Sequence, residues 1–563
     1  MTSNFAPFLI FAVGAALVAL TRGWSRRVVL VAVPVVGAIN LAFLPEGGGT
    51  TIQMLDYTLV PIRVDRLSVV FGYVFHLAAL IGVLYALHVR DTVQHVAGLL
   101  YAGSAIGALF AGDLISFFVF WELTAVTSVF LILARRTDRA RRAAMRYLVI
   151  QVLSGVLLLT GTLVRAHETG SIGFDSVGLD GPGGVLIFFA FGLKAAFPLL
   201  HNWLTDAYPE ATPTGTVFLS AFTTKLAVYA LARAFPGTEI LVYIGAVMTL
   251  FPIFYAVIEN DLRRVLSYSL INQVGFMVTG IGIGTPLALN GAVSHAFAHI
   301  VYKALLFMAM GAVLHRTGRI NGSELGGLYK SMPLTTVLCL VGAASISAFP
   351  LFSGFVSKSM VLAASLEEGY HGVWLVLLFA SAGVFHHSGI KIPFFAFFAR
   401  DSGIRTREAP VNMLLAMVLA AFVSIFLGVY PWPLYDILPF PVDFQPYTSV
   451  HVLAQSQLLF FSAAAFTVLK LTGLYPPELA GVNIDAEWVY RRLLPRAVRR
   501  AVAGLAPLDA GLRQGITKGV RRVIGGIGRI SGPQGLLART RTVGGMVGWV
   551  IALLVLYLVL NFV

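Results

Sequence analysis

The sequence predicts an all-α polytopic membrane protein with about sixteen transmembrane helices, and three observations lead to this fold class. Of the 563 residues, 58% are hydrophobic and only 12% are charged, whereas a soluble domain carries about a quarter charged residues. The mean hydropathy is +0.84. Apolar stretches also recur at a length of about 20 residues, which at 1.5 Å per residue crosses roughly 30 Å of hydrocarbon.

That length places the predicted helices in order along the chain. They are expected at 5–21, 27–44, 66–89, 93–111, 113–133, 144–164, 183–203, 213–234, 238–258, 264–282, 287–315, 332–366, 373–399, 411–430, 450–472 and 544–562. The stretch at 332–366 contains Pro350, followed by Ser353 and Gly354. Because proline removes a helical hydrogen bond, we expect a broken helix there, with its freed backbone groups facing protein or water.

The basic residues predict the orientation of these helices. Connections after odd-numbered helices hold most of the Lys and Arg, whereas the N-terminus and the other connections hold only Arg63, Arg66, Arg165 and Arg233. By the positive-inside rule, both termini are expected outside the inner (cytoplasmic) membrane of a bacterial cell. The first helix lacks a basic leader and a small-residue cleavage site, so we expect it to stay as an anchor.

An internal sequence repeat predicts two repeated structural units. Residues 195–200 read AAFPLL and residues 347–352 read SAFPLF, 152 residues apart. Five spans separate them, and an odd number of spans inverts one unit relative to the other, as in many transporters. The expected organisation is N-terminal helices in 1–92, a first repeat in 93–236, a second in 237–400, additional helices in 401–472, a basic surface segment in 473–543 and a final helix in 544–563.

The segment 473–543 is the one sizeable stretch outside the predicted helices of the membrane. Twelve basic residues from Arg491 to Arg541 alternate there with Val, Ile and Leu. This pattern is typical of helices on the cytoplasmic membrane surface, with cations facing anionic lipid. A disordered basic linker is the alternative, since the segment also contains glycines and prolines.

Ionisable residues lie within the predicted helices, where each costs several kcal/mol unless it faces protein or water. Those at mid-span are Glu122, Lys194, Lys225, His295, His299, Lys303, Lys358 and Lys391, and Asp65 lies at the outer end of its helix. Buried ion pairs that hold helices together are one explanation. Five lysines against one deep carboxylate do not balance, however, and a desolvated lysine with a lowered pKa suits a proton relay.

One helix carries a polar stripe. His295, His299 and Lys303 are spaced at i, i+4 and i+8, so they lie on one face over about 12 Å. Histidine takes up and releases protons near neutral pH, so the stripe could pass a proton into or along the membrane. A zinc site is the rival, although no Asp, Glu or Cys lies nearby in the sequence to complete it. His76 and His88 are expected to be core or boundary residues.

The composition also indicates which metals, cofactors and macromolecules the chain is not expected to bind. Cys339 is the only cysteine, so the chain cannot hold an iron–sulfur cluster or a thiolate zinc site, and we expect no metal and no cofactor. The net charge of +14 follows from membrane orientation rather than from nucleic-acid binding.

Several motifs together resemble a known family. They are FWEL at 120–123, GLKAAFP at 192–198 with His201, Trp203 and Asp206-Ala207, TKL at 224–226, NDLRRVLSYS at 260–269, His299 with KALLF at 303–307, and GFVSK at 354–358. Over roughly residues 60–400 the chain resembles the antiporter-like subunits of respiratory complex I, Mrp-type cation/proton antiporters and membrane-bound hydrogenases, most of all the D-type subunits of Mrp antiporters. The tail with its sixteenth helix resembles the longer members.

The resemblance implies roles for the intramembrane residues. Glu122 and Lys194 would be a coupled pair that gates the entrance of protons, and Lys225, His295, His299, Lys303 and Lys358 would carry the proton onward. The implied function is the proton-translocating subunit of a multisubunit Na⁺/H⁺ antiporter, with other membrane subunits, lipid, protons and Na⁺ as partners and no covalent catalysis.

Three alternatives remain open from the sequence. The same channel could belong to a redox-driven quinone oxidoreductase or hydrogenase. It could couple proton flow to the uptake of inorganic carbon. The chain could also be a purely structural membrane scaffold.

Overall fold

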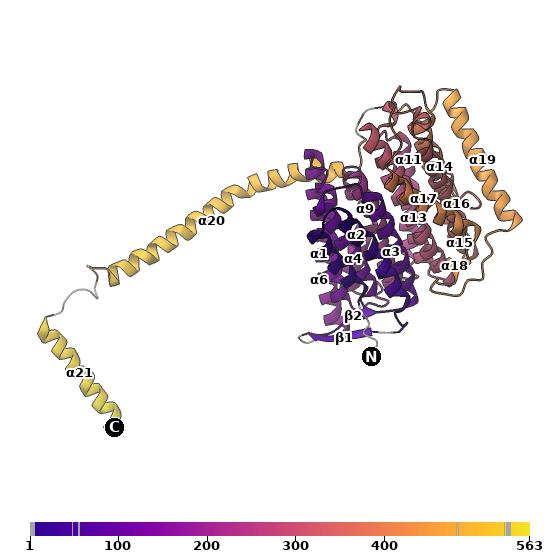
Figure 1. The fold of residues 1–563 in the computed structure, drawn as a ribbon. Coiled ribbons are helices and arrows are strands. Elements are labelled where there is room, and N and C mark those ends of the chain that lie inside the picture. Colours follow the sequence, from indigo (N-terminus) through magenta and orange to yellow (C-terminus); the bar gives the residue numbers. More distant parts are fainter. Residues whose placement is uncertain are drawn as a thin grey trace. The chain divides into compact units, whose positions relative to one another are not determined.

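The computed structural model describes residues 6–47, 49–54, 57–479, 481, 483–533, 535 and 542–562. The chain forms two compact units, Met1–Asn483 and Ile484–Val563. The first unit is a bundle of helices, most of which run side by side (Figure 1). Its extent goes beyond residue 472, where the predicted bundle ends.

The elements of the first unit follow one another along the chain. Up to the middle of the bundle they are α1 Pro7–Leu20, α2 Gly23–Ala42, β1 Gly49–Met54, β2 Tyr57–Arg63, α3 Arg66–Ala86, α4 Thr92–Phe110, α5 Leu114–Leu133, α6 Asp138–Thr169, α7 Pro182–Ala195, α8 Asn202–Ala207, α9 Pro213–Ala221, α10 Thr223–Ala234 and α11 Ile240–Ile258. The rest are α12 Leu262–Ile283, α13 Pro286–Thr317, η1 Gly322–Glu324, η2 Leu328–Lys330, α14 Pro333–Ile346, α15 Ser353–Glu367, α16 His371–Val384, η3 Phe385–Lys391, η4 Phe394–Phe398, α17 Val411–Val429, α18 Trp432–Tyr435 and α19 Ser449–Leu471. The second unit contains η5 Val489–Leu493, α20 Leu494–Ser531 and α21 Val543–Phe562.

The predicted fold class is confirmed. Among the described residues, thirteen helices are long and apolar enough to cross a membrane. Three shorter apolar helices, α1, α7 and α14, lie within the remaining predicted segments. Every predicted segment therefore contains a helix, whereas the number of spans stays a prediction. The sequence pattern did not reveal one feature, the antiparallel hairpin β1–β2, which lies at one end of the bundle (Figure 1).

Aspartates cap the first turns of α5, which carries Glu122, and of α12. The Asp113 side chain accepts from the Ser116 N–H at the start of α5, and Asp261 caps α12 in the same way. A cap of this kind satisfies N–H groups that have no partner inside the helix. Each aspartate also forms an isolated β-bridge, Asp113 to Gly173 and Asp261 to Asn321. Both partners in the second bridge lie 148 residues after those in the first.

The two AFP sequences form equivalent breaks in the backbone. After α7, Ala196 and Leu199 have φ of +65° and +69°, and after α14, Ala348 and Leu351 have φ of +56° and +73°. Left-handed backbone at a residue with a side chain costs about 1–2 kcal/mol, so this shared geometry needs support from the surrounding packing. The break predicted near Pro350 is present. The matching bridges and breaks support the predicted repeat, while its inversion stays a prediction.

Two of the predicted helices are interrupted at points that the sequence did not predict. The helix predicted at 213–234 is divided between α9 and α10 at Phe222, where no proline occurs. The helix predicted at 373–399 changes after Val384 from α-helix to the π-helical turns η3 and η4. Insertions of this kind are frequent at functional sites. Both interrupted helices carry one of the intramembrane lysines.

The second unit contains one long amphipathic helix. Over α20, large apolar residues recur every three or four positions, which places them on one face. They are Leu494, Val498, Val502, Leu505, Leu508, Leu512, Ile516, Val520, Val523, Ile527 and Ile530. The segment is therefore helical over α20, and its contact with a membrane surface stays a prediction. Arg539 and Arg541 of the predicted surface segment lie outside the described residues.

Candidate functional site

Glu122 and Lys194 are brought together by α5 and the last turn of α7. The Lys194 ammonium donates to the Trp121 carbonyl oxygen at 2.7 Å and to Thr124 Oγ1 at 3.3 Å. It also lies 4.1 Å from the centre of the Trp121 ring. Lys194 is buried and is attracted to the Glu122 carboxylate, but in the described structure it bonds to the residue before Glu122.

The Glu122 carboxylate occupies space left by a glycine on α6. A Cβ atom built at Gly155 would lie 1.5 Å from Glu122 Oε1. That oxygen is buried and has no hydrogen-bond partner among the described residues. The carboxylate therefore faces α6 without a fixed donor, which leaves it free to change partners.

Three of the other lysines bind carbonyl oxygens at interrupted or terminal helix turns. Lys225 Nζ donates to the Ser220 carbonyl at 2.6 Å, across the break between α9 and α10. Lys358 Nζ donates to the Ile346 carbonyl at 3.1 Å, at the end of α14. Lys391 Nζ donates to the carbonyls of Val257 and Glu259 at 2.6 Å each, at the end of α11. The last carbonyls of a helix lack internal partners and carry partial negative charge, so they stabilise a buried cation.

The stripe on α13 is fully buried. His295 Nδ1 lies 3.1 Å from Ser357 Oγ, next to Lys358 in the chain. The rings of His295 and His299 have centroids 6.2 Å apart. Both nitrogens of His299 and the Lys303 ammonium are buried and have no hydrogen-bond partner within the described part of the chain. Groups in this condition need bound water or a neutral state, because an unpaired buried charge is very costly.

A polar network from α11 and α12 borders the stripe. Tyr302 precedes Lys303 in the chain, and its hydroxyl donates to Gln273 Oε1 at 3.0 Å. Gln273 in turn donates to Asn272 Oδ1 at 2.6 Å, and Asn272 donates to the Thr249 carbonyl. This network fixes the Tyr302 ring, which packs against His299 with centroids 5.3 Å apart.

The intramembrane residues thus form connected groups. Glu122 and Lys194 form one group. The charges of Lys225, Lys303 and Lys358 all act on His299, which makes the stripe the centre of a second group. Lys391 belongs to a third group, because its ammonium lies 2.9 Å from Glu478 Oε1 in a buried ion pair. Glu478 was not among the predicted site residues, since it lies in the segment predicted to be on the membrane surface.

The remaining predicted residues lie outside these groups. Asp65 caps α3 and forms an ion pair with Arg233 at 2.8 Å. His76 is buried, with Nδ1 2.7 Å from the Gly72 carbonyl, and His88 lies 3.1 Å from Asn412 Nδ2. These positions agree with the expected core and boundary roles of the two histidines.

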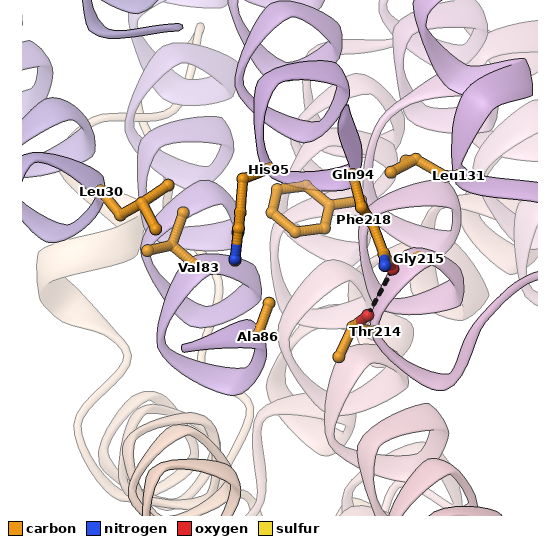
Figure 2. Close-up of a pocket in the computed structure, with 9 residues that line it drawn as sticks. All are labelled: Leu30, Val83, Ala86, Gln94, His95, Leu131, Thr214, Gly215 and Phe218. Atoms are coloured by element: carbon orange, nitrogen blue, oxygen red, sulfur yellow. Dashed lines mark hydrogen bonds between the residues drawn. The ribbon is translucent and has the colours of Figure 1, made fainter. Parts of the chain in front are cut away.

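A small cavity elsewhere in the bundle does not reach these groups. It has a volume of about 10 Å³, enough for roughly one water molecule, and lies between α2, α3, α4, α5 and α9. Figure 2 shows Gln94 pointing toward Thr214, whose hydroxyl donates to Gln94 Oε1 at 2.7 Å. None of the predicted proton-carrying residues lines it.

A bundle of apolar helices around buried lysines and histidines defines the class of polytopic membrane proteins. The family model "NADH:quinone oxidoreductase/Mrp antiporter, TM" matches residues 111–386. The D-type subunit of the Na⁺/H⁺ antiporter from Alkalihalophilus pseudofirmus is 30% identical over 469 residues, which cover 76% of this chain and 94% of that protein. The chain therefore belongs to the NADH:quinone oxidoreductase/Mrp antiporter family of membrane proteins.

Other relatives match different shares of their length. The A/B-type subunit of a probable K⁺/H⁺ antiporter from Rhizobium meliloti is 34% identical over 355 residues, which cover 58% of this chain but only 34% of that protein. The chain thus spans about a third of that longer relative. An archaeal respiratory complex, the membrane-bound sulfane sulfur reductase, contains a chain of the same fold with a TM-score of 0.72 and 22% identity, covering 98% of this chain and 99% of the other.

Proposed function

We propose that this chain is the proton-translocating subunit of a multisubunit antiporter that exchanges protons for monovalent cations. Protons would pass along Glu122, Lys194, Lys225, the stripe of His295, His299 and Lys303, and then Lys358 and Lys391. The step at each residue is the loss and gain of one proton, helped by bound water. The relatives are named as subunits of Na⁺/H⁺ and K⁺/H⁺ antiporters. These names support Na⁺ or K⁺ as the ion that is exchanged for protons.

The observation that carries this proposal is the buried stripe on α13. Fixed structural charges are normally satisfied by hydrogen bonds, yet Lys303 and His299 have no hydrogen-bond partner among the described residues. Histidine and desolvated lysine are groups that can release a proton near neutral pH. A buried row of such groups fits a hydrated proton path better than helix cohesion.

The surroundings of the chain follow from the same proposal. We place it in the cytoplasmic membrane of a bacterial cell, with both termini outside, as the distribution of basic residues predicts. The exposed apolar faces of the bundle would contact lipid and other membrane subunits. Residues 93–236 and 237–400 would act as two half-channels, each with one broken helix.

Substitution of Glu122 tests the proposal. The complex that contains Glu122→Gln should assemble normally, because the amide fits the same space, but it should lose proton flux by about 100-fold, the scale of a lost proton-transfer group. The measurement is the change in internal pH of proteoliposomes on addition of Na⁺ or K⁺. Flux at the wild-type rate in this variant would show that protons do not pass through Glu122.

A further inference from the structure

Lys391 and Glu478 form an ion pair in which both side chains are nearly inaccessible. The Lys391 side chain is 0% exposed and the Glu478 side chain is 6% exposed. Lys391 lies in the π-helical turn η3, whereas Glu478 lies in the irregular segment after α19. Residues on both sides of Glu478 reach the surface, because Leu474 is 73% exposed and Leu479 is 67% exposed. The buried pair is therefore flanked in the chain by residues at the surface of the bundle.

The pair lies where several connections predicted on the cytoplasmic side meet. Glu259 follows α11, and its backbone carbonyl accepts from Lys391. Gly322 follows α13, and a Cβ atom there would lie 3.6 Å from Glu478 Oε2. Lys470, at the end of α19, lies 5.2 Å from the Tyr475 ring and acts on Glu478 through its charge. An exit at this position would release protons on one defined side of the membrane.

A buried histidine links the pair to the stripe. His387 lies one helical turn before Lys391 and is 0% exposed. Its Nδ1 lies 2.8 Å from Ser388 Oγ, which donates to Ser269 Oγ at 2.7 Å, while Nε2 has no partner in the described part of the chain. The charges of both Lys303 and Lys391 act on His387. The imidazole is therefore close enough to both Lys303 of the α13 stripe and Lys391 of the ion pair to feel their charges.

Glu478 differs from a carboxylate that serves only as a fixed counter-ion. A structural ion pair in a protein interior is stable only when further hydrogen bonds satisfy the remaining lone pairs. Apart from the Lys391 contact, neither Glu478 oxygen accepts a hydrogen bond from the described residues. Burial raises the pKa of the Glu478 carboxyl, and the charge of Lys391 opposes that rise. Movement of Lys391 would thus change the proton affinity of Glu478.

We propose that Glu478 is a proton-carrying residue that connects the membrane path to the cytoplasmic side through His387 and Lys391. This inference rests on the proposed function and extends it by two residues. The Lys391 ammonium gives a proton to the Glu478 carboxylate, so one N–H bond breaks, one O–H bond forms, and both groups become neutral. Lys391 then regains a proton from the His387 side, and Glu478 releases its proton to water. In the opposite direction of transport, the steps reverse.

The first test replaces Glu478 in the intact complex. Glu478→Gln should reduce proton flux by about 100-fold, as expected for a lost proton-transfer group, whereas Glu478→Asp should restore part of it. Glu324→Gln is the matched control, because Glu324 is an exposed acid in η1 whose contact with Asn321 a glutamine can keep. Wild-type flux in Glu478→Gln would overturn the proposal. Lys391→Arg provides a second variant, since it keeps the ion pair but not an easily released proton, and it should also block flux.

A double variant separates a relay from a counter-ion. If the Lys391–Glu478 pair is only a structural ion pair outside the proton path, then removal of both charges in Lys391→Met with Glu478→Gln should restore flux that Glu478→Gln alone has lost. If the pair carries protons, the double variant stays inactive. Glu122→Gln is measured beside these variants. Loss in Glu122→Gln with full flux in Glu478→Gln rejects only the exit through Glu478, while full flux in both rejects the proposed function as well.

Discussion

At the scale of the residue, the buried cations of this chain find different partners, and the partner indicates what each can do. Lys225 and Lys358 bind carbonyl oxygens, and Lys391 binds a carboxylate as well as carbonyl oxygens. Lys303 has no hydrogen-bond partner among the described residues. A lysine held by carbonyl dipoles can stay charged in the membrane, whereas Lys303 requires water or deprotonation. Lys303 is therefore the residue whose charge state depends most on hydration.

Gly155 provides a residue-scale prediction. In Gly155→Ala the new methyl group would overlap Glu122 Oε1, and because this oxygen ends a flexible side chain, the carboxylate can move while the fold stays intact. We expect normal assembly and a fall in proton flux of about 10- to 100-fold, since small misplacement of a reacting group has costs of this size. Flux is measured in proteoliposomes beside Gly372→Ala, where a Cβ atom meets no neighbour. Equal flux in the two variants would show that the Glu122 position is not critical.

At the scale of the element, the chain places lysines where helices are interrupted. The break after α14 leaves the Ile346 carbonyl free to accept from Lys358, and the break after α9 does the same for Lys225 and Ser220. A continuous helix in lipid would use these carbonyls internally. The interruptions therefore create the acceptors that make a buried lysine tolerable.

Lys358 tests whether such a lysine is a fixed charge or a proton carrier. Arginine keeps the positive charge but does not release its proton at accessible pH. We expect Lys358→Arg to block proton flux as fully as Lys358→Met, with a loss of about 100-fold in each. If the arginine variant transports protons and the methionine variant does not, Lys358 is a static charge.

The sequence predicted some elements and missed others for physical reasons. Lysines within apolar stretches and a proline at 350 are local signals, so the intramembrane residues and one broken helix could be found. The break at Phe222 has no proline to mark it, and the π-helical turns around Lys391 depend on packing. Glu478 lies in a proline-rich segment at 473–479 that looks solvent-exposed, and only tertiary contacts bury it. His387 was overlooked because nothing in its local sequence distinguishes it from a core histidine.

At the scale of the whole molecule, the orientation can be measured with introduced cysteines. The only native cysteine, Cys339, is buried, so labelling by a membrane-impermeant maleimide should have little background. A cysteine in place of Ser176, which follows α6, should react in intact cells, whereas a cysteine in place of Glu324 should react only after the membrane is opened. The reverse pattern would invert the orientation and put Glu478 on the outer side.

The proposed proton path depends most on the stripe on α13. The direct test is proton flux in proteoliposomes that contain the complex with Lys303→Ala, or with His295→Ala and His299→Ala together, and His76→Ala as the control. His76 is buried but lies outside the three groups. We predict a loss of about 100-fold in both stripe variants, with normal assembly and a much smaller effect in the control. Wild-type flux in the stripe variants, or an equal loss in the control, would contradict the relay.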